Sequence, residues 1–328
     1  MLRILMGGSP CTHWSIAQKK DRETEAKGLG WDLFCCYLRA KEIYQPDFFL
    51  YENNWSAANV IKDKICEELD KPLIHINSAL VSAQNRDRFY VTNIPNVKQP
   101  TDKGIGFKDI IEPIQGAISE PFCVAQRGVY IETMNRYTKY DSPIVQKYEI
   151  RKDNKGNALT TVCKDVMCGV RVKDTAKDYS IEVENKSVVV EKNEIKKKYI
   201  IDLPDGKYKI RNLTTVERRR LQTIPDWYKM QGRVSKDLRL LGNGWTVEVI
   251  KHILSNIPNI KKEEVEVLSM FDGMACGMIA LKELGVNVVR YRASEIEEYA
   301  IETVKLNFPE IEQIGDAFKI EEIEELRK

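Results

Sequence analysis

Arg3-Ile4-Leu5-Met6-Gly7-Gly8-Ser9-Pro10-Cys11 is a short apolar run, typical of a buried strand, that leads into a glycine-containing turn with a thiol. A second apolar run, Phe48-Phe49-Leu50-Tyr51, leads in the same way into Glu52-Asn53-Asn54. In an open α/β sheet, ligands bind at the edge formed by the carboxyl ends of the parallel strands. A cysteine nucleophile beside a carboxylic acid suits addition to an electron-poor ring, because one atom is attacked while another is protonated.

Helix and strand patterns alternate on both sides of these two runs. The expected helices cover residues 30–44, 60–69, 245–257, 277–284 and a stretch ending at 307. The expected strands cover residues 2–6, 48–51, 73–77, 88–92, 266–271, 288–293 and a short stretch near 314. Strands that alternate with helices predict an α/β fold with a doubly wound, mostly parallel sheet.

The composition changes after Pro95. The following stretch is rich in Lys, Gly, Pro, Asn and Asp and contains short β-type runs. Within it, Pro204-Asp205-Gly206 is a turn signal that predicts a hairpin. We therefore expect a small β-rich target-recognition domain at residues 96–231, inserted between the two halves of one α/β domain at residues 1–95 and 232–328.

The overall composition narrows the class of protein. The 328 residues carry a formal net charge of +2, which alone predicts no polyanionic partner. Charge is uneven, since residues 183–220 hold 11 Lys/Arg against 6 Asp/Glu and residues 295–328 hold 4 against 11. This pattern allows one basic face, although most charge runs are solvated surface. Eight cysteines without framework spacing, three histidines without ligand spacing and no apolar run of about 20 residues predict a soluble cytoplasmic protein without metal or membrane contact.

The last part of the chain contains a candidate nucleotide site. A strand enters Phe271-Asp272-Gly273, a helix follows Gly277, and the next strand ends at Glu295. An acid about twenty residues beyond such a turn suits ribose hydroxyls. The turn lacks the G-x-G-x-x-G pattern of a pyrophosphate cradle, so a ligand with an adenosine and no diphosphate fits better, and S-adenosylmethionine is such a ligand. The alternative is a tight turn that needs glycine only for packing.

Six motifs together carry a resemblance to a known family. They are Gly7-Gly8-Ser9-Pro10-Cys11, Glu52-Asn53, Gln84-Asn85-Arg86-Asp87-Arg88, residues 213–222, Gly242-Asn243-Gly244-Trp245 and Phe271-Asp272-Gly273. In this combination the chain resembles the DNA cytosine-5 methyltransferases, and near Gly7, Trp245 and Phe271 it is similar to the mammalian de novo type. Most of that family has the cofactor motif first, whereas here it comes last. The resemblance therefore implies a complete, circularly permuted enzyme.

The resemblance implies a role for each matching residue. Cys11 is expected to add to C6 of a cytosine, Glu52 to protonate or hydrogen-bond N3, Arg88 to contact the base O2, and Arg86 to brace the site. The implied cofactor is S-adenosyl-L-methionine, with S-adenosyl-L-homocysteine as the product. The residues expected to bind it are Pro10, Asn243, Trp245, Phe271, Asp272, Gly273, Gly277, Glu295, Ile296, Asp316 and Ala317.

The implied partner is double-stranded DNA, from which the target base must be flipped because its C5 is unreachable inside a duplex. The expected DNA contacts are Ser9, Ser15, Lys19, Lys20, Arg22 and Gln84. The compact permuted form suggests a bacterial or phage enzyme, either a restriction-modification partner or an orphan. A homodimer is left open.

Two positions depart from the family pattern. Thr12 follows the cysteine where Gln or Asn is usual, and Asn54 stands where Val is usual. Both change the wall of the pocket and neither removes a catalytic atom. The alternative functions are cytosine-5 methylation of transfer RNA, which one subgroup of the family performs, and a catalytically silent DNA-binding homologue. Plain structural roles also stay open, such as a buried thiol for Cys11 or a helix cap for Glu52.

Overall fold

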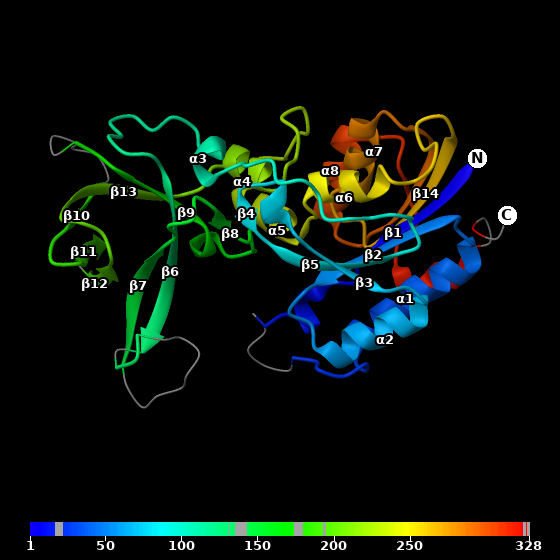
Figure 1. The fold of residues 1–328 in the computed structure, drawn as a ribbon, viewed down its shortest axis with the longest axis horizontal. Helices are drawn as coiled ribbons and strands as arrows, with labels where there is room; N and C mark the ends of the chain where they lie inside the picture. The colour runs from blue at the N-terminus through cyan, green and yellow to red at the C-terminus, as the bar shows by residue number, and fades with distance from the viewer. Residues whose placement is uncertain are drawn as a thin grey trace.

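The computed structural model describes residues 1–16, 22–130, 132–134, 143–173, 180–192, 195–323 and 326. The chain forms two lobes that lie side by side along the long axis of the molecule (Figure 1). The larger lobe contains the first strand and the last helices, and the smaller lobe is built from the middle of the chain. In the described ranges, no helix is long and apolar enough to cross a membrane.

A seven-stranded sheet organises the larger lobe, in the order β16-β15-β14-β1-β2-β5-β3. Neighbours pair in parallel from β16 to β2, whereas β5 is antiparallel to both β2 and β3. This arrangement confirms the doubly wound, mostly parallel sheet that the sequence predicts. The strands are β1 (Leu2–Gly7), β2 (Phe48–Asn54), β3 (Leu73–Asn77), β5 (Asp87–Thr92), β14 (Glu264–Met270), β15 (Asn287–Ser294) and β16 (Glu312–Gln313).

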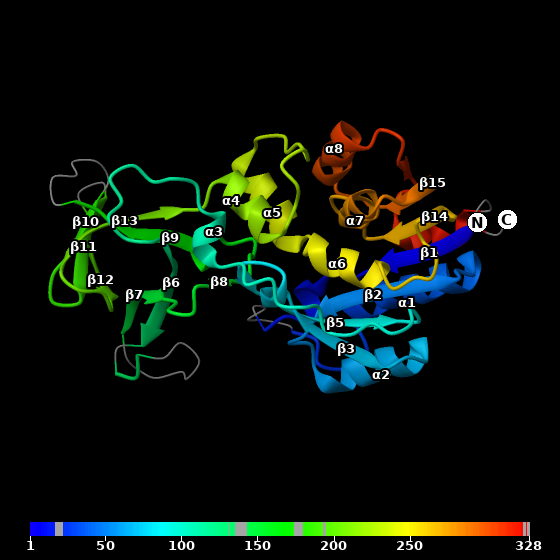
Figure 2. The ribbon, with the colours of Figure 1, turned by 45° about the horizontal axis from the view of Figure 1, so that its top comes forward.

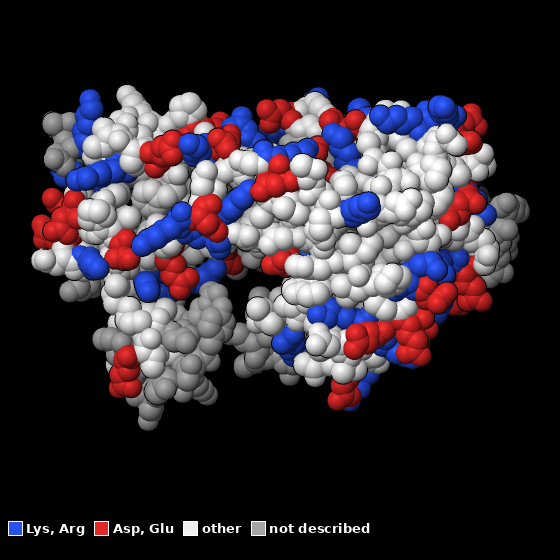
Figure 3. Space-filling model, in the orientation of Figure 1, with Lys and Arg blue, Asp and Glu red and all other residues white. Residues whose placement is uncertain are grey.

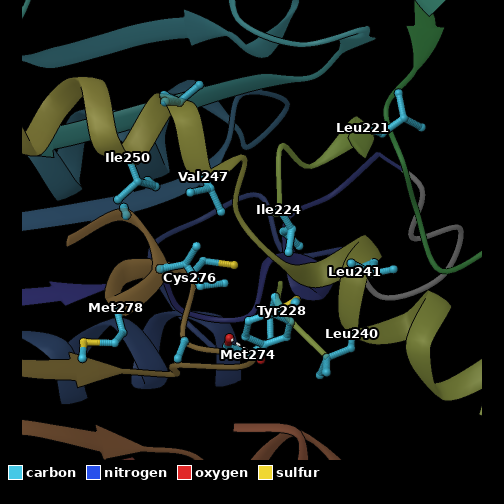
Figure 4. Packing of buried hydrophobic residues seen from close by; sticks show 14 of the residues in the cluster. Leu221, Ile224, Tyr228, Leu240, Leu241, Val247, Ile250, Met274, Cys276 and Met278 are labelled. Atoms are coloured by element: carbon cyan, nitrogen blue, oxygen red, sulfur yellow. Dashed lines mark hydrogen bonds between the residues drawn. The ribbon is translucent and has the colours of Figure 1, made fainter. Parts of the chain in front are cut away.

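Helices cover both faces of this sheet (Figure 2). One face carries α1 (Leu29–Tyr44), α2 (Asn59–Leu69) and η4 (Ala317–Glu322), and the other carries α6 (Val247–Leu254), α7 (Cys276–Leu284) and α8 (Glu298–Asn307). Because β1 is covered on both sides, Ile4, Leu5 and Met6 are all fully buried, which explains its uninterrupted apolar run. Figure 4 shows Val247 and Ile250 of α6 lying together with Cys276 of α7 in the core.

The connections of the central strands create a crevice at the carboxyl edge of the sheet. The chain leaves β1 through α1 toward β2, and it leaves the adjacent strand β14 through α7 toward β15 on the other side. Where neighbouring strands connect in opposite directions, their carboxyl ends diverge and leave room for a ligand. Ser9-Pro10-Cys11 follows β1 and Phe271-Asp272-Gly273 follows β14, so both motifs lie at this crevice.

The smaller lobe contains a second seven-stranded sheet, in the order β10-β13-β9-β6-β7-β12-β11. Its strands are β6 (Phe122–Tyr130), β7 (Ile144–Ile150), β9 (Met167–Arg171), β10 (Ile181–Val183), β11 (Ser187–Lys192), β12 (Ile195–Ile201) and β13 (Gly206–Asn212). The prediction of a hairpin at Pro204-Asp205-Gly206 was wrong. The turn connects β12 to β13, but β12 pairs with β7 and β11 while β13 pairs with β9 and β10.

Short elements join the two lobes. Strands β4 (Gln84–Asn85) and β8 (Gly156–Asn157) pair with each other in parallel. This small sheet connects the segment before β5 of the larger lobe to the smaller lobe. Helices α3 (Phe107–Ile110), α4 (Thr215–Leu221) and α5 (Val234–Asn243) occupy the junction (Figure 1). Three single 3-10 turns complete the described structure, η1 (Cys11–His13), η2 (Ser78–Leu80) and η3 (Cys163–Asp165).

The two ends of the chain lie at the same end of the larger lobe (Figure 1). The Arg3 guanidinium donates a hydrogen bond to the carbonyl oxygen of Leu326 across 3.2 Å. Helix α1, which follows β1, also packs against η4 near the other end of the chain. The first strand and the last described residues therefore belong to one packed unit.

Candidate active site

A single cavity of about 840 Å³ lies at the carboxyl edge of the larger sheet. It brings together residues that are far apart in the sequence, from the turns after β1, β2, β14 and β15 and from the start of α6. The predicted site residues that line it are Ser9, Pro10, Cys11, Glu52, Arg86, Arg88, Asn243, Trp245, Phe271, Asp272, Gly273, Glu295, Ile296, Asp316 and Ala317.

Glu52 is held at both of its carboxylate oxygens. It is almost completely buried at the end of β2, where it faces Tyr90 of the antiparallel strand β5. Arg88, two residues away on β5, pairs through Nε with Oε1 at 2.8 Å. The indole N–H of Trp245 donates to Oε2 across 2.9 Å. Two donors on opposite oxygens fix the plane of the carboxyl group within the cavity.

The turn that carries Cys11 is tied to the end of β2. The amide of Asn53 donates to the carbonyl oxygen of Ser9 at 2.9 Å, and the hydroxyls of Ser9 and Tyr51 lie 2.7 Å apart. Glycine is required at position 8, because an added Cβ would lie 2.6 Å from the Glu52 carbonyl oxygen. This close approach places the thiol of Cys11 and the carboxyl of Glu52 on the same wall.

Arg86 fixes the backbone around Trp245. Its side chain is 3 % exposed and donates to three carbonyl oxygens, those of Leu159 at 2.8 Å, Gly242 at 3.1 Å and Gly244 at 2.9 Å. Burial lowers the pKa of Arg86 to about 10, with a smaller contribution from Arg88. At neutral pH the group therefore stays cationic and keeps all of its donors.

The opposite half of the cavity is built around Asp272. The Tyr291 hydroxyl donates to its Oδ1 at 2.7 Å, while its Oδ2 is buried without a hydrogen-bond partner among the described residues. Burial raises the pKa of Asp272 to about 6. A buried carboxylate oxygen without a partner is costly, so this atom suits a ligand that brings a donor.

Glu295 is oriented by backbone N–H groups. Its Oε2 accepts from Gly273, and its Oε1 accepts from Ile296 and Glu297, all at 2.8 Å. Gly273 has a φ of +61°, in the left-handed region that favours glycine, so the turn can bring its N–H to the carboxylate. Oε2, which accepts one N–H, keeps acceptor capacity for a hydroxyl donor from a ligand.

Exposed apolar side chains flank this half of the cavity. Ile296 is 73 % exposed and Phe318 is 48 % exposed, although both line the cavity wall. Between them, Asp316 accepts a hydrogen bond from the Phe318 N–H at 3.0 Å. Apolar side chains beside the carboxylates of Glu295 and Asp316 fit the adenine and ribose of S-adenosylmethionine, and the unpartnered Asp272 Oδ2 fits a cationic amino group. The residues present therefore fit this cofactor.

The structure corrects three expected contacts. Gly277 does not line the cavity, and an added Cβ there would lie 2.6 Å from Met6, so this glycine serves packing rather than the cofactor. Gln84 is fully buried and bonds to Leu221, Gln222 and Leu159. The Ser9 hydroxyl lines the cavity but is bonded to Tyr51. Neither Gln84 nor Ser9 presents its side chain to DNA in this structure.

The remaining expected DNA contacts lie after Cys11. Lys19 and Lys20 are outside the described residues. Arg22 donates to the carbonyl oxygens of Trp14 and Ser56, so here it ties this segment to the turn after β2. Ser15 is half-buried, and its N–H donates to the Cys11 carbonyl at 3.0 Å.

The two departures from the family pattern have different surroundings. Thr12 lines the cavity and is exposed. Asn54 instead turns back on its own chain, where its Oδ1 accepts from the N–H and the hydroxyl of Ser56 at 3.0 and 3.1 Å. Thr12 is therefore the departure that a substrate can meet directly.

Sequence reasoning missed several residues of the cavity wall. Lys236 and Arg239 are exposed at its rim, three residues apart on one face of α5. Tyr299 closes the wall behind them, and its hydroxyl donates to the buried Asp237 at 2.6 Å. The spacing of the two cations just before Gly242-Asn243-Gly244-Trp245 was the signal that could have indicated them.

The sheet order and the crevice fit the fold of the S-adenosylmethionine-dependent methyltransferases. A family model described as "C-5 cytosine-specific DNA methylase" matches residues 2–259, and the chain belongs to this family. A similar solved structure is a mutant of DNMT2 from Spodoptera frugiperda. It is 15% identical, the alignment covers 77% of this chain and 78% of that chain, and the TM-score is 0.38. In the described part of the chain, no group of three or more His, Cys, Asp or Glu residues could hold a metal ion.

Proposed function

We propose that this protein transfers a methyl group from S-adenosylmethionine to C5 of a flipped-out cytosine in double-stranded DNA, through a covalent bond between Cys11 and C6. The observation that carries the proposal is the shared cavity. Cys11, Glu52 and Arg88 line it together with Asp272 and Glu295.

The side chains present can perform each part of this chemistry. The Cys11 sulfur forms a bond to C6, while a proton from Glu52 reaches N3 and Arg88 donates to the base O2. S-adenosylmethionine, when bound, supplies the electrophilic methyl group for C5. Afterwards a base or water removes the C5 proton, the electron pair restores the C5–C6 double bond, the Cys11–C6 bond breaks, and the proton on N3 returns to Glu52.

DNA is the favoured substrate because the matching family is described as a DNA methylase and because the smaller lobe offers a second surface beside the cavity. Figure 3 shows Lys and Arg side chains along the smaller lobe and the junction, interleaved with acidic ones, and a notch between the two lobes. Exposed Lys236 and Arg239 at the cavity rim suit phosphate contacts. Transfer RNA is the second candidate, which the experiment below separates.

We also propose that the order of the motifs is a circular permutation and that residues 96–231 form the recognition domain. The match to the family model ends at residue 259, before the strand that carries Phe271. The contact between Arg3 and Leu326 supports a chain whose ends could be joined. The second sheet, from Phe122 to Asn212, falls inside the proposed domain. A bacterial or phage enzyme acting in the cytoplasm is consistent with this compact arrangement.

The first prediction is that the protein forms 5-methylcytosine in mixed-sequence duplex DNA when S-adenosylmethionine is present. Digestion to nucleosides and mass spectrometry measure the product. Cys11→Ala should lower the rate by at least about 10³-fold, because the nucleophile is lost. Binding of S-adenosylhomocysteine, measured by calorimetry, should be unchanged in this variant.

Other outcomes would redirect the proposal. Product in transfer RNA and none in DNA would assign the RNA substrate. No product in either, with normal S-adenosylhomocysteine binding, would indicate a silent homologue. Equal product from Cys11→Ala would contradict the covalent mechanism.

A further inference from the structure

We infer that Trp245 is a positioning residue for Glu52. The inference rests on the proposed function, which gives Glu52 its role. The indole lines the same cavity as Asp272 and Glu295, and its N–H donates to the carboxyl group of Glu52.

The geometry of the contact is that of a fixed donor. Nε1 of Trp245 lies 2.9 Å from Oε2 of Glu52, while Arg88 holds Oε1 at 2.8 Å. An indole N–H donates and cannot accept, so the contact has one polarity at every pH. Without this contact, the carboxyl group of Glu52 would be held only at Oε1, by Arg88, and it could rotate.

The backbone on each side of Trp245 is anchored, so the indole direction is set. The Gly244 carbonyl accepts from Arg86 at 2.9 Å and from Gln222 at 3.1 Å. On the other side, the Thr246 hydroxyl donates to Gln222 at 3.2 Å and lies 2.9 Å from the hydroxyl of Ser78. This buried network explains why the Gln84-to-Arg88 motif and the Gly242-to-Trp245 motif occur together in one site.

The test replaces the indole by a ring without a donor. Trp245→Phe keeps an aromatic wall for the cofactor and removes only the N–H contact. We expect kcat to fall by about tenfold, the usual effect of one hydrogen bond to a charged group. The KM for S-adenosylmethionine and the calorimetric affinity for S-adenosylhomocysteine should stay within about twofold.

The split between kcat and cofactor binding distinguishes positioning from packing. Loss of the Trp245 donor should lower kcat, while the KM for S-adenosylmethionine and the affinity for S-adenosylhomocysteine stay unchanged, because the contact is made to Glu52. A packing defect in the cavity wall would weaken cofactor binding together with kcat.

A matched control exists on the surface. Trp227 also donates its indole N–H to a glutamate, Glu283, at 3.0 Å, but it does not line the cavity. Trp227→Phe should leave kcat and cofactor affinity unchanged. Wild-type kinetics in Trp245→Phe, or a loss of S-adenosylhomocysteine affinity as large as the loss of kcat, would overturn the inference.

A second readout needs no turnover. The difference in tryptophan fluorescence between the wild type and Trp245→Phe reports on Trp245, and it should change in the Glu52→Gln background, where the carboxyl group beside the indole is replaced. If the wild type methylates neither DNA nor RNA, the proposed function fails, and this comparison still decides the contact: a difference signal that Glu52→Gln leaves unchanged would overturn it.

Discussion

Arg86 shows how a single residue can brace a site without touching a substrate. Its guanidinium donates to three backbone carbonyl oxygens from two segments, that of Leu159 and those of Gly242 and Gly244 just before Trp245. A flexible ammonium has no planar fork and cannot meet three carbonyls spread in this way. The residue therefore connects the smaller lobe at Leu159 to the wall of the cavity.

Loss of Arg86 should destabilise the fold. We expect Arg86→Met to lower the free energy of unfolding by about 3 kcal/mol, because the carbonyl oxygens of Leu159 and Gly242 lose this donor and that of Gly244 keeps only Gln222. Urea denaturation at pH 7 measures the change. Arg239→Met, at an exposed position on α5, should stay within about 0.5 kcal/mol. Equal effects of the two substitutions would contradict a bracing role for Arg86.

At the scale of single residues, the sequence predicted which side chains carry the chemistry better than it predicted which side chains are exposed. Cys11 and Glu52 could be found because reactive side chains at the carboxyl ends of parallel strands must meet at one edge of the sheet. Arg88 was implied by the resemblance alone, and it reaches this edge because it lies at the start of the antiparallel strand β5. The burial of Gln84 could not be predicted, because it depends on Gln222, which lies far away in the sequence and packs beside it only in the folded chain. The same holds for Trp245, whose donor contact to Glu52 no local pattern indicates.

Among the elements, α4 is the one most firmly tied to both lobes. Glu217 in its first turn caps the helix with Thr214 and is fully buried. It accepts two hydrogen bonds from Arg211 of β13, at 2.6 and 2.7 Å, and one from the Glu112 N–H at 3.0 Å. Burial alone would raise the pKa of Glu217, but the donors from Arg211, Thr214 and Glu112 outweigh it and the pKa is lowered.

This lowered pKa predicts a pH-dependent contribution to stability. A carboxylate with a folded pKa below its unfolded value of 4.5 stabilises the fold above that value, and the stabilisation is lost as pH falls through the folded pKa. Glu217→Gln should therefore cost about 2–3 kcal/mol at pH 7, and the difference from the wild type should shrink as the pH falls below 4.5. Denaturation curves between pH 7 and pH 3 measure this.

The control for Glu217 is an exposed glutamate. Glu120 pairs with Lys108 at 2.8 Å, and its side chain is 75% exposed. Glu120→Gln should change the free energy of unfolding by less than about 1 kcal/mol, as exposed ion pairs contribute little. A constant difference between Glu217→Gln and the wild type at every pH would show that the charge of Glu217 is not what stabilises the junction.

Periodic elements could be predicted and strand partners could not. The expected helix at residues 30–44 corresponds to α1 because its apolar spacing reports one buried face. The turn at Pro204-Asp205-Gly206 forms as predicted, but the strands on either side pair elsewhere. A turn signal is local, whereas partner choice depends on the apolar faces of distant strands in the same sheet.

On the scale of the whole molecule, the order of the strands along the chain differs from their order in the sheet. β1 lies in the middle of the sheet and pairs with β14, although they are separated by most of the sequence. In a doubly wound sheet the crevice lies beside such a pair, so the fold needs both strands but does not need one to precede the other. The contact of Arg3 with Leu326 shows that the region around the chain ends is packed together.

If the motif order is a permutation, the chain should tolerate being reordered. We predict that a variant which starts at Lys262, joins residue 328 to Met1 by about eight Gly/Ser residues and ends at Lys261 will fold, since Lys261 and Lys262 are exposed between α6 and β14. It would place Phe271-Asp272-Gly273 first and Gly242-Asn243-Gly244-Trp245 last. Its circular dichroism should match the wild type, with a Tm within about 5 °C.

The control is a second permuted chain with the same linker, whose new ends lie between Val267 and Leu268. Both residues are fully buried in β14, so this opening breaks a central strand and should prevent folding. Folding of the Lys262 variant beside failure of the β14 variant would show that the linker and the joined ends are tolerated, and that the position of the opening decides the outcome. Failure of both would mean that the ends cannot be joined without strain, and the motif order would then be a constraint of this fold rather than a permutation of it.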